Sequence, residues 1–258
     1  MTFCRSSGYT FADSDAAAYV AAVEAADAAS LEDGVKSAID ALFAGLKADG
    51  EWNAFGVLRV YAGPRTLAGC AVPAKGVAPT LVNFVSGDLN RETGLVGDAA
   101  SKRIDSNYSN TTPAQNSRQS WVWLTTATLD GTLRSVFGAG DNAAGSTSIR
   151  SNSSTAKQAY CSGLGAGNFT AAITAGLVGV NRSGSTNFIY RTGGASETLT
   201  VTSTTPLSAN FSSLANSTPS RYSAHRIELE AHGGAWTNPA NIESRISTYL
   251  AAIAAAIV

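Results

Sequence analysis

The acidic pair Glu228 and Glu230 is the arrangement in this sequence that comes closest to a catalytic site. Residues two apart on a β-strand project to the same face, roughly 7 Å apart, and two carboxylates facing a sugar are what glycoside hydrolysis requires. On such a strand Arg226 and His232 share the face of the acids, while the apolar residues between them point inward. The alternative is a solvated outer face on which Arg226 pairs with Glu228. We favour this alternative, because the next position along the face is a histidine and not a third acid.

Metal, nucleophile and phosphate motifs give no better candidate. His225 and His232 are seven residues apart, which is not the spacing of a zinc motif. The sequence contains no Gly-x-Ser-x-Gly, and no cysteine has a histidine nearby. The glycine-rich run at 163–167 lacks the Lys-Ser/Thr that follows a phosphate-binding loop. The sequence therefore predicts no catalytic residue, no metal site and no cofactor.

Aromatic side chains near the ends of expected strands are the candidates for sugar binding. Ring faces stack on sugar faces, and neutral amides and hydroxyls complete such sites. The alternative is structural: the tyrosines fill sheet edges and the tryptophan packs the last helix. The candidate glycan-binding residues are Tyr108, Tyr160, Tyr190, Asn142 and Trp236, with Asn107, Asn110 and Asp141 in neighbouring loops.

The composition limits the partners. The chain has 258 residues, a formal net charge of −1 and only 14% charged residues. It has no basic cluster of the kind that binds phosphate backbones, so nucleic acid is not an expected partner. A surface rich in Ser, Thr and Asn suits sugar recognition and dense assemblies. The apolar end at 250–258 is too short to span a bilayer, and the three cysteines Cys4, Cys70 and Cys161 allow no full disulfide framework.

The first fifty residues predict two helices. Residues 15–28 are rich in alanine and follow capping side chains at 13–15. From Ser30 onward, apolar residues at steps of three and four predict a second helix that ends at Gly50. The apolar face of the first helix is narrow and mostly alanine. We therefore expect it to pack on another helix, on another subunit or on the domain that follows.

After Gly50 the pattern changes to short β-strands separated by turn residues, which favours a sandwich or jelly roll. Asn238 and Pro239 then begin a final helix. We expect an N-terminal helical segment for attachment or assembly at 1–50, and one β-sandwich at 51–258 closed by the C-terminal helix. The expected strands are 55–61, 81–85, 121–126, 133–137, 168–173, 177–180, 187–191, 198–202 and 225–231.

Four segments carry a resemblance to a known family. Residues 49–63 resemble a module of bacteriophage and prophage virion proteins in which a short helix ends in Gly-x-Trp before a strand. Residues 84–107 resemble the turn and strand that follow in that module. Residues 226–252 are similar to the closing strand and helix of laminin-G-like jelly rolls in phage fibres, and 19–36 looks like the helical lead-in of cyanophage proteins of this type. The resemblance implies a mainly β, concanavalin A-like jelly-roll sandwich with an N-terminal helical segment and a C-terminal helix.

The resemblance also implies a function. We expect a non-enzymatic structural protein of the virion, made in the host cytoplasm and displayed on the particle as a tail fibre or a capsid decoration. The expected partners are copies of itself, as a homotrimer or another homo-oligomer, other virion proteins and host-surface glycans. Two other functions remain open: a dedicated glycan-binding receptor adhesin, and a glycoside hydrolase that uses Glu228 and Glu230. Neither nucleic acid nor membrane insertion is expected.

Overall fold

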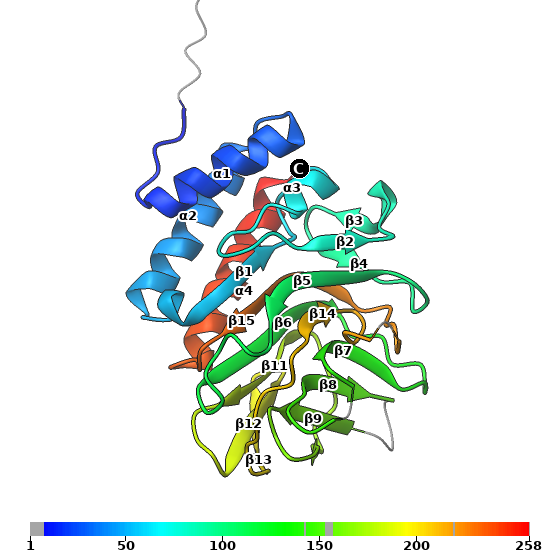
Figure 1. The fold of residues 1–258 in the computed structure, drawn as a ribbon. Helices are drawn as coiled ribbons and strands as arrows, with labels where there is room; N and C mark the ends of the chain where they lie inside the picture. The colour runs from blue at the N-terminus through cyan, green and yellow to red at the C-terminus, as the bar shows by residue number, and fades with distance from the viewer. Residues whose placement is uncertain (1–7, 142, 153–156, 219, 258) are drawn as a thin grey trace, which may run out of the picture.

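The protein has three layers, one of helices and two of β-sheet (Figure 1). A computed structural model describes residues 8–141, 143–152, 157–218 and 220–257. The two sheets are antiparallel and pack face to face, and the long helices lie against the outer face of the first sheet. The prediction of a mainly β sandwich with N-terminal helices and a C-terminal helix is confirmed.

The first sheet, sheet A, is built around two long strands that pair along their length, β6 (Arg118–Thr126) and β15 (Arg226–Gly233). β1 (Phe55–Val60) pairs with the other side of β15. Helices cover one face of these strands and the second sheet covers the other, so both faces are buried. The remaining strands are β11 (Gly176–Arg182), β12 (Asn187–Thr192) and β13 (Ala195–Thr200) beside β6, and β4 (Gly94–Val96) and β3 (Leu89–Asn90) beside β15.

Sheet B forms the opposite layer. Apolar residues of its strands face sheet A and belong to the core between the sheets. Among the described residues, no helix lies on its outer face, which carries loops instead (Figure 1). In spatial order its strands are β10 (Gly167–Asn168), β9 (Lys157–Cys161), β8 (Thr147–Ser151), β7 (Arg134–Ala139), β14 (Asn210–Ser213), β5 (Arg103–Ser109) and β2 (Thr80–Val82).

The helices begin at side chains suited to their positions. Asp13 accepts hydrogen bonds from the backbone N–H groups of the first turn of α1. Asn238 caps α4, and Pro239 occupies its first position. None of the described helices is long and apolar enough to cross a bilayer. The helices are α1 (Ser14–Asp27), α2 (Asp33–Ala48), α3 (Leu67–Cys70) and α4 (Pro239–Ala256), with short 3-10 turns η1 (Trp52–Ala54) and η2 (Ser86–Asp88).

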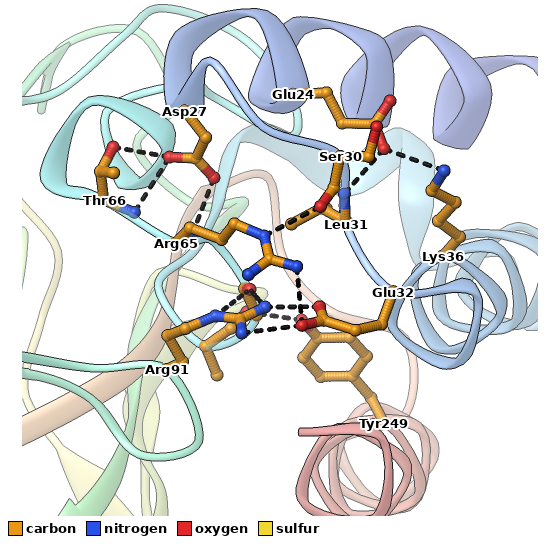
Figure 2. Close-up of polar contacts among 12 residues, drawn as sticks. Glu24, Asp27, Ser30, Leu31, Glu32, Lys36, Arg65, Thr66, Arg91 and Tyr249 are labelled. Atoms are coloured by element: carbon orange, nitrogen blue, oxygen red, sulfur yellow. Dashed lines mark hydrogen bonds and ion pairs between the residues drawn. The ribbon is translucent and has the colours of Figure 1, made fainter. Parts of the chain in front are cut away.

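Ion pairs fasten the connection between α1 and α2 to the sandwich (Figure 2). The Glu32 carboxylate accepts hydrogen bonds from Arg65 at 2.8 Å and from both terminal nitrogens of Arg91, at 3.0 and 2.6 Å. The Asp27 carboxylate accepts from the backbone N–H groups of Arg65 and Thr66, at 2.7 and 2.9 Å. The apolar side chains of α1, α2 and α4 share one core with sheet A. The N-terminal helices therefore pack against the sandwich and cover one side of it.

The strands of sheet B depart most from the sequence-based expectation. The strand expected at 168–173 is wrong, because only Gly167–Asn168 pairs there. Four strands of sheet B were not expected at all: β5, β8, β9 and β14. In sheet A the short strands β3 and β4 were not expected either. Each of the four strands of sheet B carries polar side chains at two or more positions, and these dilute the apolar signal by which strands are predicted.

Candidate functional site

Glu228 and Glu230 lie on opposite faces of sheet A, so the prediction that they share a solvated face is wrong. The pairing of β15 with β6 shifts register between Ile227 and Leu229. Ile227 belongs to the core between the sheets, whereas Leu229 belongs to the core between sheet A and the helices. Such a β-bulge reverses the alternation of side chains. Glu230 lies between the sheets, where its Oε1 accepts a hydrogen bond from Arg59 at 3.1 Å, and Glu228 lies toward α4. Both acids are buried, so this pair cannot flank a sugar chain.

Both histidines are structural. Burial lowers the pKa of His225 to about 4, and its Nδ1 accepts a hydrogen bond from the backbone N–H of Thr128 at 2.9 Å. Burial, with the nearby Arg59 charge, lowers the pKa of His232 well below its ordinary value. The His232 ring stacks on Phe211 with centroids 4.1 Å apart. No group of three metal-binding side chains lies together within the ranges that the structure describes.

Three of the aromatic candidates for sugar stacking are buried. Tyr190 stacks on Phe169 with centroids 3.9 Å apart, and Trp236 belongs to the helix-facing core. The Tyr160 hydroxyl accepts a hydrogen bond from Arg150 at 3.1 Å, and the ring is only 4% exposed. Burial of these rings agrees with the structural alternative, because the strands and α4 use their apolar bodies to fill the interior, and it leaves no exposed ring face at these positions for a sugar.

The remaining candidates fall in different places. Tyr108 is half-buried and stacks on the core, while Asn142 lies outside the described residues. Asn110 is fully buried, and its amide donates to two backbone carbonyls. Asp141 is bound by arginines. Among the polar residues expected near a sugar, Asn107 is the one that lines an open cleft.

The cleft lies on the outer face of sheet B, over β5 and β14, and has a volume of about 410 Å³. β5 contributes alternate residues to its floor, β14 contributes the consecutive residues 210–212, and one side comes from the loop after β14. The lining residues are Arg103, Asp105, Asn107, Ala209, Asn210, Phe211, Ser212, Ser217 and Thr218.

A bulge in β5 presents Asn107 to the cleft. Asn210 pairs with Ser109 and Ser212 pairs with Asp105, so three residues of β5 stand opposite one residue of β14. Asn107 takes up the extra length with φ of 54°, a left-handed conformation that asparagine tolerates better than most residues. Its amide nitrogen donates to the Ala78 carbonyl at 2.9 Å, which fixes the side chain at the cleft.

The charged groups of the cleft compensate each other. Asp105 Oδ1 accepts hydrogen bonds from Arg103 Nε at 2.9 Å and from Ser212 Oγ at 3.2 Å. The hydrogen bond from the guanidinium to Asp105 raises the pKa of Arg103. The side chains of Arg103 and Asp105 are 21% and 32% exposed, so both remain accessible to a ligand. The cleft therefore offers donors and acceptors without net charge.

A row of paired residues crosses sheet B and passes through the cleft. Directly paired residues share a face. A Cβ added at Gly138 would lie 3.3 Å from the Cβ of Asn216, so the loop after β14 covers the row where it crosses β7. Only the part of the row toward β5 and β2 is therefore accessible from the cleft. In order the row is Tyr160, Ser148, Gly138, Ser212, Asp105 and Thr80.

The lining groups suit hydrogen bonding to a ligand. Asp105 is the one acid among the lining residues, and glycoside hydrolysis uses two carboxyl groups about 5 to 9.5 Å apart. Among the described residues, no histidine or cysteine lines the cleft. Amides, hydroxyls and one arginine–aspartate pair remain. These groups donate to and accept from hydroxyl groups of a neutral ligand.

Arg103, Asp105 and Ser212 were not predicted from the sequence as site residues. A signal for two of them was present, because residues 103–109 alternate polar and less polar side chains with a period of two, as a half-exposed strand does. Ile104 is the buried anchor of that strand. No comparable signal marks Ser212, which depends on the pairing of β14 with β5.

Comparison with known proteins gives little further guidance. No protein-family model and no curated protein matches the chain. Among solved structures, one similar chain is domain 4 of AbnA, a GH43 extracellular arabinanase from Geobacillus stearothermophilus, solved in complex with arabinotriose. The two chains are 15% identical, the match covers 66% of this chain and 82% of that one, and the TM-score is 0.42. At this level the likeness supports no inference about function.

Proposed function

We propose that this protein is a non-enzymatic binding protein that holds a neutral sugar in the cleft over β5 and β14. The observation that carries the proposal is the cleft itself. It is open, uncharged overall and lined mainly by amide, hydroxyl and paired charged groups. Sugar sites depend on such convergent donors and acceptors, because each ring presents several hydroxyls that both donate and accept.

The geometry sets an expectation for affinity. Among the described residues that line the cleft, Phe211 is the one aromatic residue, and it is largely buried, so stacking contributes little. For a single sugar we expect a Kd on the order of 1 mM, or about −4 kcal/mol. Binding to a multivalent glycan surface by several copies would then gain from effective concentration.

The setting of this activity follows from the sequence resemblance and is part of the proposal. We propose that the chain is displayed on a phage particle, as a fibre or capsid decoration, where copies of it contact host-surface glycans. The low charge of the chain supports repeated contacts between subunits, because burying charge at an interface is costly. Antibody labelling of purified particles tests this setting. Particles without label would remove the virion role and leave the cleft proposal standing.

A glycan array followed by titration tests the binding proposal. We expect the wild-type chain to bind neutral saccharides, and Asp105→Ala to weaken that binding by about tenfold or more, because a hydrogen bond to a charged group contributes about 1.5–3 kcal/mol. Asp33→Ala is the matched control, since Asp33 is an exposed acid on the helical side. A blank array, or equal binding by the Asp105→Ala chain, would contradict the proposal.

A further inference from the structure

Five polar side chains meet in the core between the sheets and form what we call the inter-sheet polar cluster: Arg59, Tyr61, Ser120, Glu230 and His232. Arg59 pairs with Glu230 across β1 and β15, and His232 pairs with Ser120 across β15 and β6. Tyr61 follows β1 and lies near enough to feel the charges of Arg59 and Glu230. Each of the five is at most 1% exposed. The cluster therefore lies on three adjacent strands of sheet A and is sealed from solvent.

Most of the polar atoms of this cluster have no partner among the described residues. Arg59 donates to Glu230 Oε1 and to the carbonyls of Val77 and Ser106. Six other atoms have no hydrogen-bond partner within 3.5 Å among the described residues, namely Arg59 Nε, Tyr61 Oη, Ser120 Oγ, Glu230 Oε2 and both ring nitrogens of His232. Of these, the Tyr61 hydroxyl lies close enough to the Glu230 carboxylate for the two groups to interact. An unsatisfied buried group costs about 1–3 kcal/mol, and roughly nine in ten buried polar groups in proteins are satisfied. Six such atoms in one place indicate a partner from outside the chain.

The charges decide what kind of partner fits. Arg59 and Glu230 cancel each other, and Arg59 would repel a metal ion. Burial keeps His232 neutral by lowering its pKa, and keeps Tyr61 neutral by raising its pKa. A neutral cluster with both donors and acceptors calls for a small neutral molecule that can donate and accept at once. Water has these properties, and a chain of this length is expected to hold roughly ten buried waters.

We propose that ordered water molecules are bound in the inter-sheet polar cluster, where they bridge His232 and Ser120 to Glu230 and Tyr61. The site is independent of the cleft on sheet B and of the function proposed for it. Bound water gives each nitrogen and oxygen a partner without adding charge. It also links the strands of sheet A through their side chains as well as through the backbone ladder.

A crystal structure of the full chain at a resolution that shows individual waters tests the proposal directly. We expect density within hydrogen-bonding distance of at least two of the six atoms. The result that would overturn the proposal is a dry site in which Tyr61 donates directly to Glu230 and Ser120 bonds directly to His232. An anomalous signal there after a bromide soak would overturn it as well, because it would show an anion site.

A solution measurement keeps the test independent of crystal growth. Water-to-protein NOEs should appear at the amides of Ser120 and His232, and Tyr61→Phe should weaken them by removing one anchoring hydroxyl. Tyr190→Phe is the matched control, because its hydroxyl is also buried without a partner but lies on β12 against Phe169. Absence of these NOEs in the wild type, or an equal loss in both variants, would contradict the proposal.

Discussion

β15 and β5 carry similar charge patterns but lie in different surroundings. Each alternates charged or polar side chains with apolar ones, β15 with two glutamates and β5 with Arg103 and Asp105. From Ile227 onward every residue of β15 is buried, whereas β5 alternates partly exposed and buried positions over its first four residues and is partly or fully exposed from Asn107 onward. The difference shows that the layers around a strand, and not its own pattern, decide whether its charges meet solvent.

The surroundings also decide what the charges do. On β15, Glu230 is sealed between the sheets and must be compensated by Arg59. On β5, Arg103 and Asp105 pair with each other but stay partly hydrated, so they remain available to a ligand. The acids that look catalytic in the sequence are therefore structural, and the acid of the cleft lies on a strand with no catalytic signature.

Breaking the buried ion pair between Arg59 and Glu230 should lower the free energy of unfolding more than any other substitution proposed below. Arg59→Met leaves Glu230 buried without its partner, so we expect the free energy of unfolding to fall by about 3–5 kcal/mol. Arg103→Met, the same change on β5, should cost about 1 kcal/mol or less. Urea denaturation followed by circular dichroism measures both. Equal costs would show that the two strands do not differ in burial as described.

Removing the acid on the helix side of β15 should change the pH dependence of stability. Burial raises the pKa of Glu228 to about 7 from 4.5, so its contribution to stability is fully present below pH 4.5 and is lost as the pH rises through 7. Glu228→Gln should therefore gain stability relative to the wild type over that range, by about 3 kcal/mol at most. Thermal unfolding between pH 4 and 8 measures this gain. Glu92→Gln, at an exposed position, is the control, and parallel curves for wild type and Glu228→Gln would contradict the burial of this acid.

The sequence predicted the elements that are strongly apolar and missed those that carry the cleft. Strands such as 121–126 and 177–180 and the C-terminal helix were predicted, because their apolar residues and caps are local signals. β5 and β14 were missed, because a strand with one solvated polar face has few apolar residues. The shared face of Glu228 and Glu230 was wrong because a β-bulge depends on the pairing of β15 with β6, which no local pattern records.

Substitutions at Asn107, in the β5 bulge, can test the left-handed backbone and the side-chain amide separately. Asn107→Gly keeps the left-handed backbone but removes the amide, so we expect stability within about 0.5 kcal/mol of the wild type and sugar binding weakened several-fold. Asn107→Ala should additionally lose about 1 kcal/mol of stability, because alanine disfavours positive φ. Titration of both variants, with denaturation alongside, measures the two effects. Full binding by Asn107→Gly would remove the amide from the site.

Weakening the ion pairs that hold the connection between α1 and α2 should change stability only a little. The Arg91 and Arg65 guanidinium groups lower the pKa of Glu32 to about 2, so its contribution to stability is present above pH 4.5 and is lost as the pH falls toward 2. Because the group is about one-third exposed, we expect Glu32→Gln to cost about 1 kcal/mol or less at pH 7. Thermal unfolding at pH 7 and pH 3 measures the difference, with Asp33→Asn as the exposed neighbouring control. A cost that grows as the pH falls would contradict the assignment.

The most direct test of the sugar-binding cleft is an amide NMR titration of the full chain with a neutral saccharide. We predict that the shifts that change with ligand concentration map to Arg103–Ser109, Asn210–Ser213 and residues 217–218 on the outer face of sheet B. Shifts concentrated on the helices or on β15, or no shifts at millimolar sugar, would contradict the claim that the binding surface is the outer face of sheet B, which none of the described helices covers.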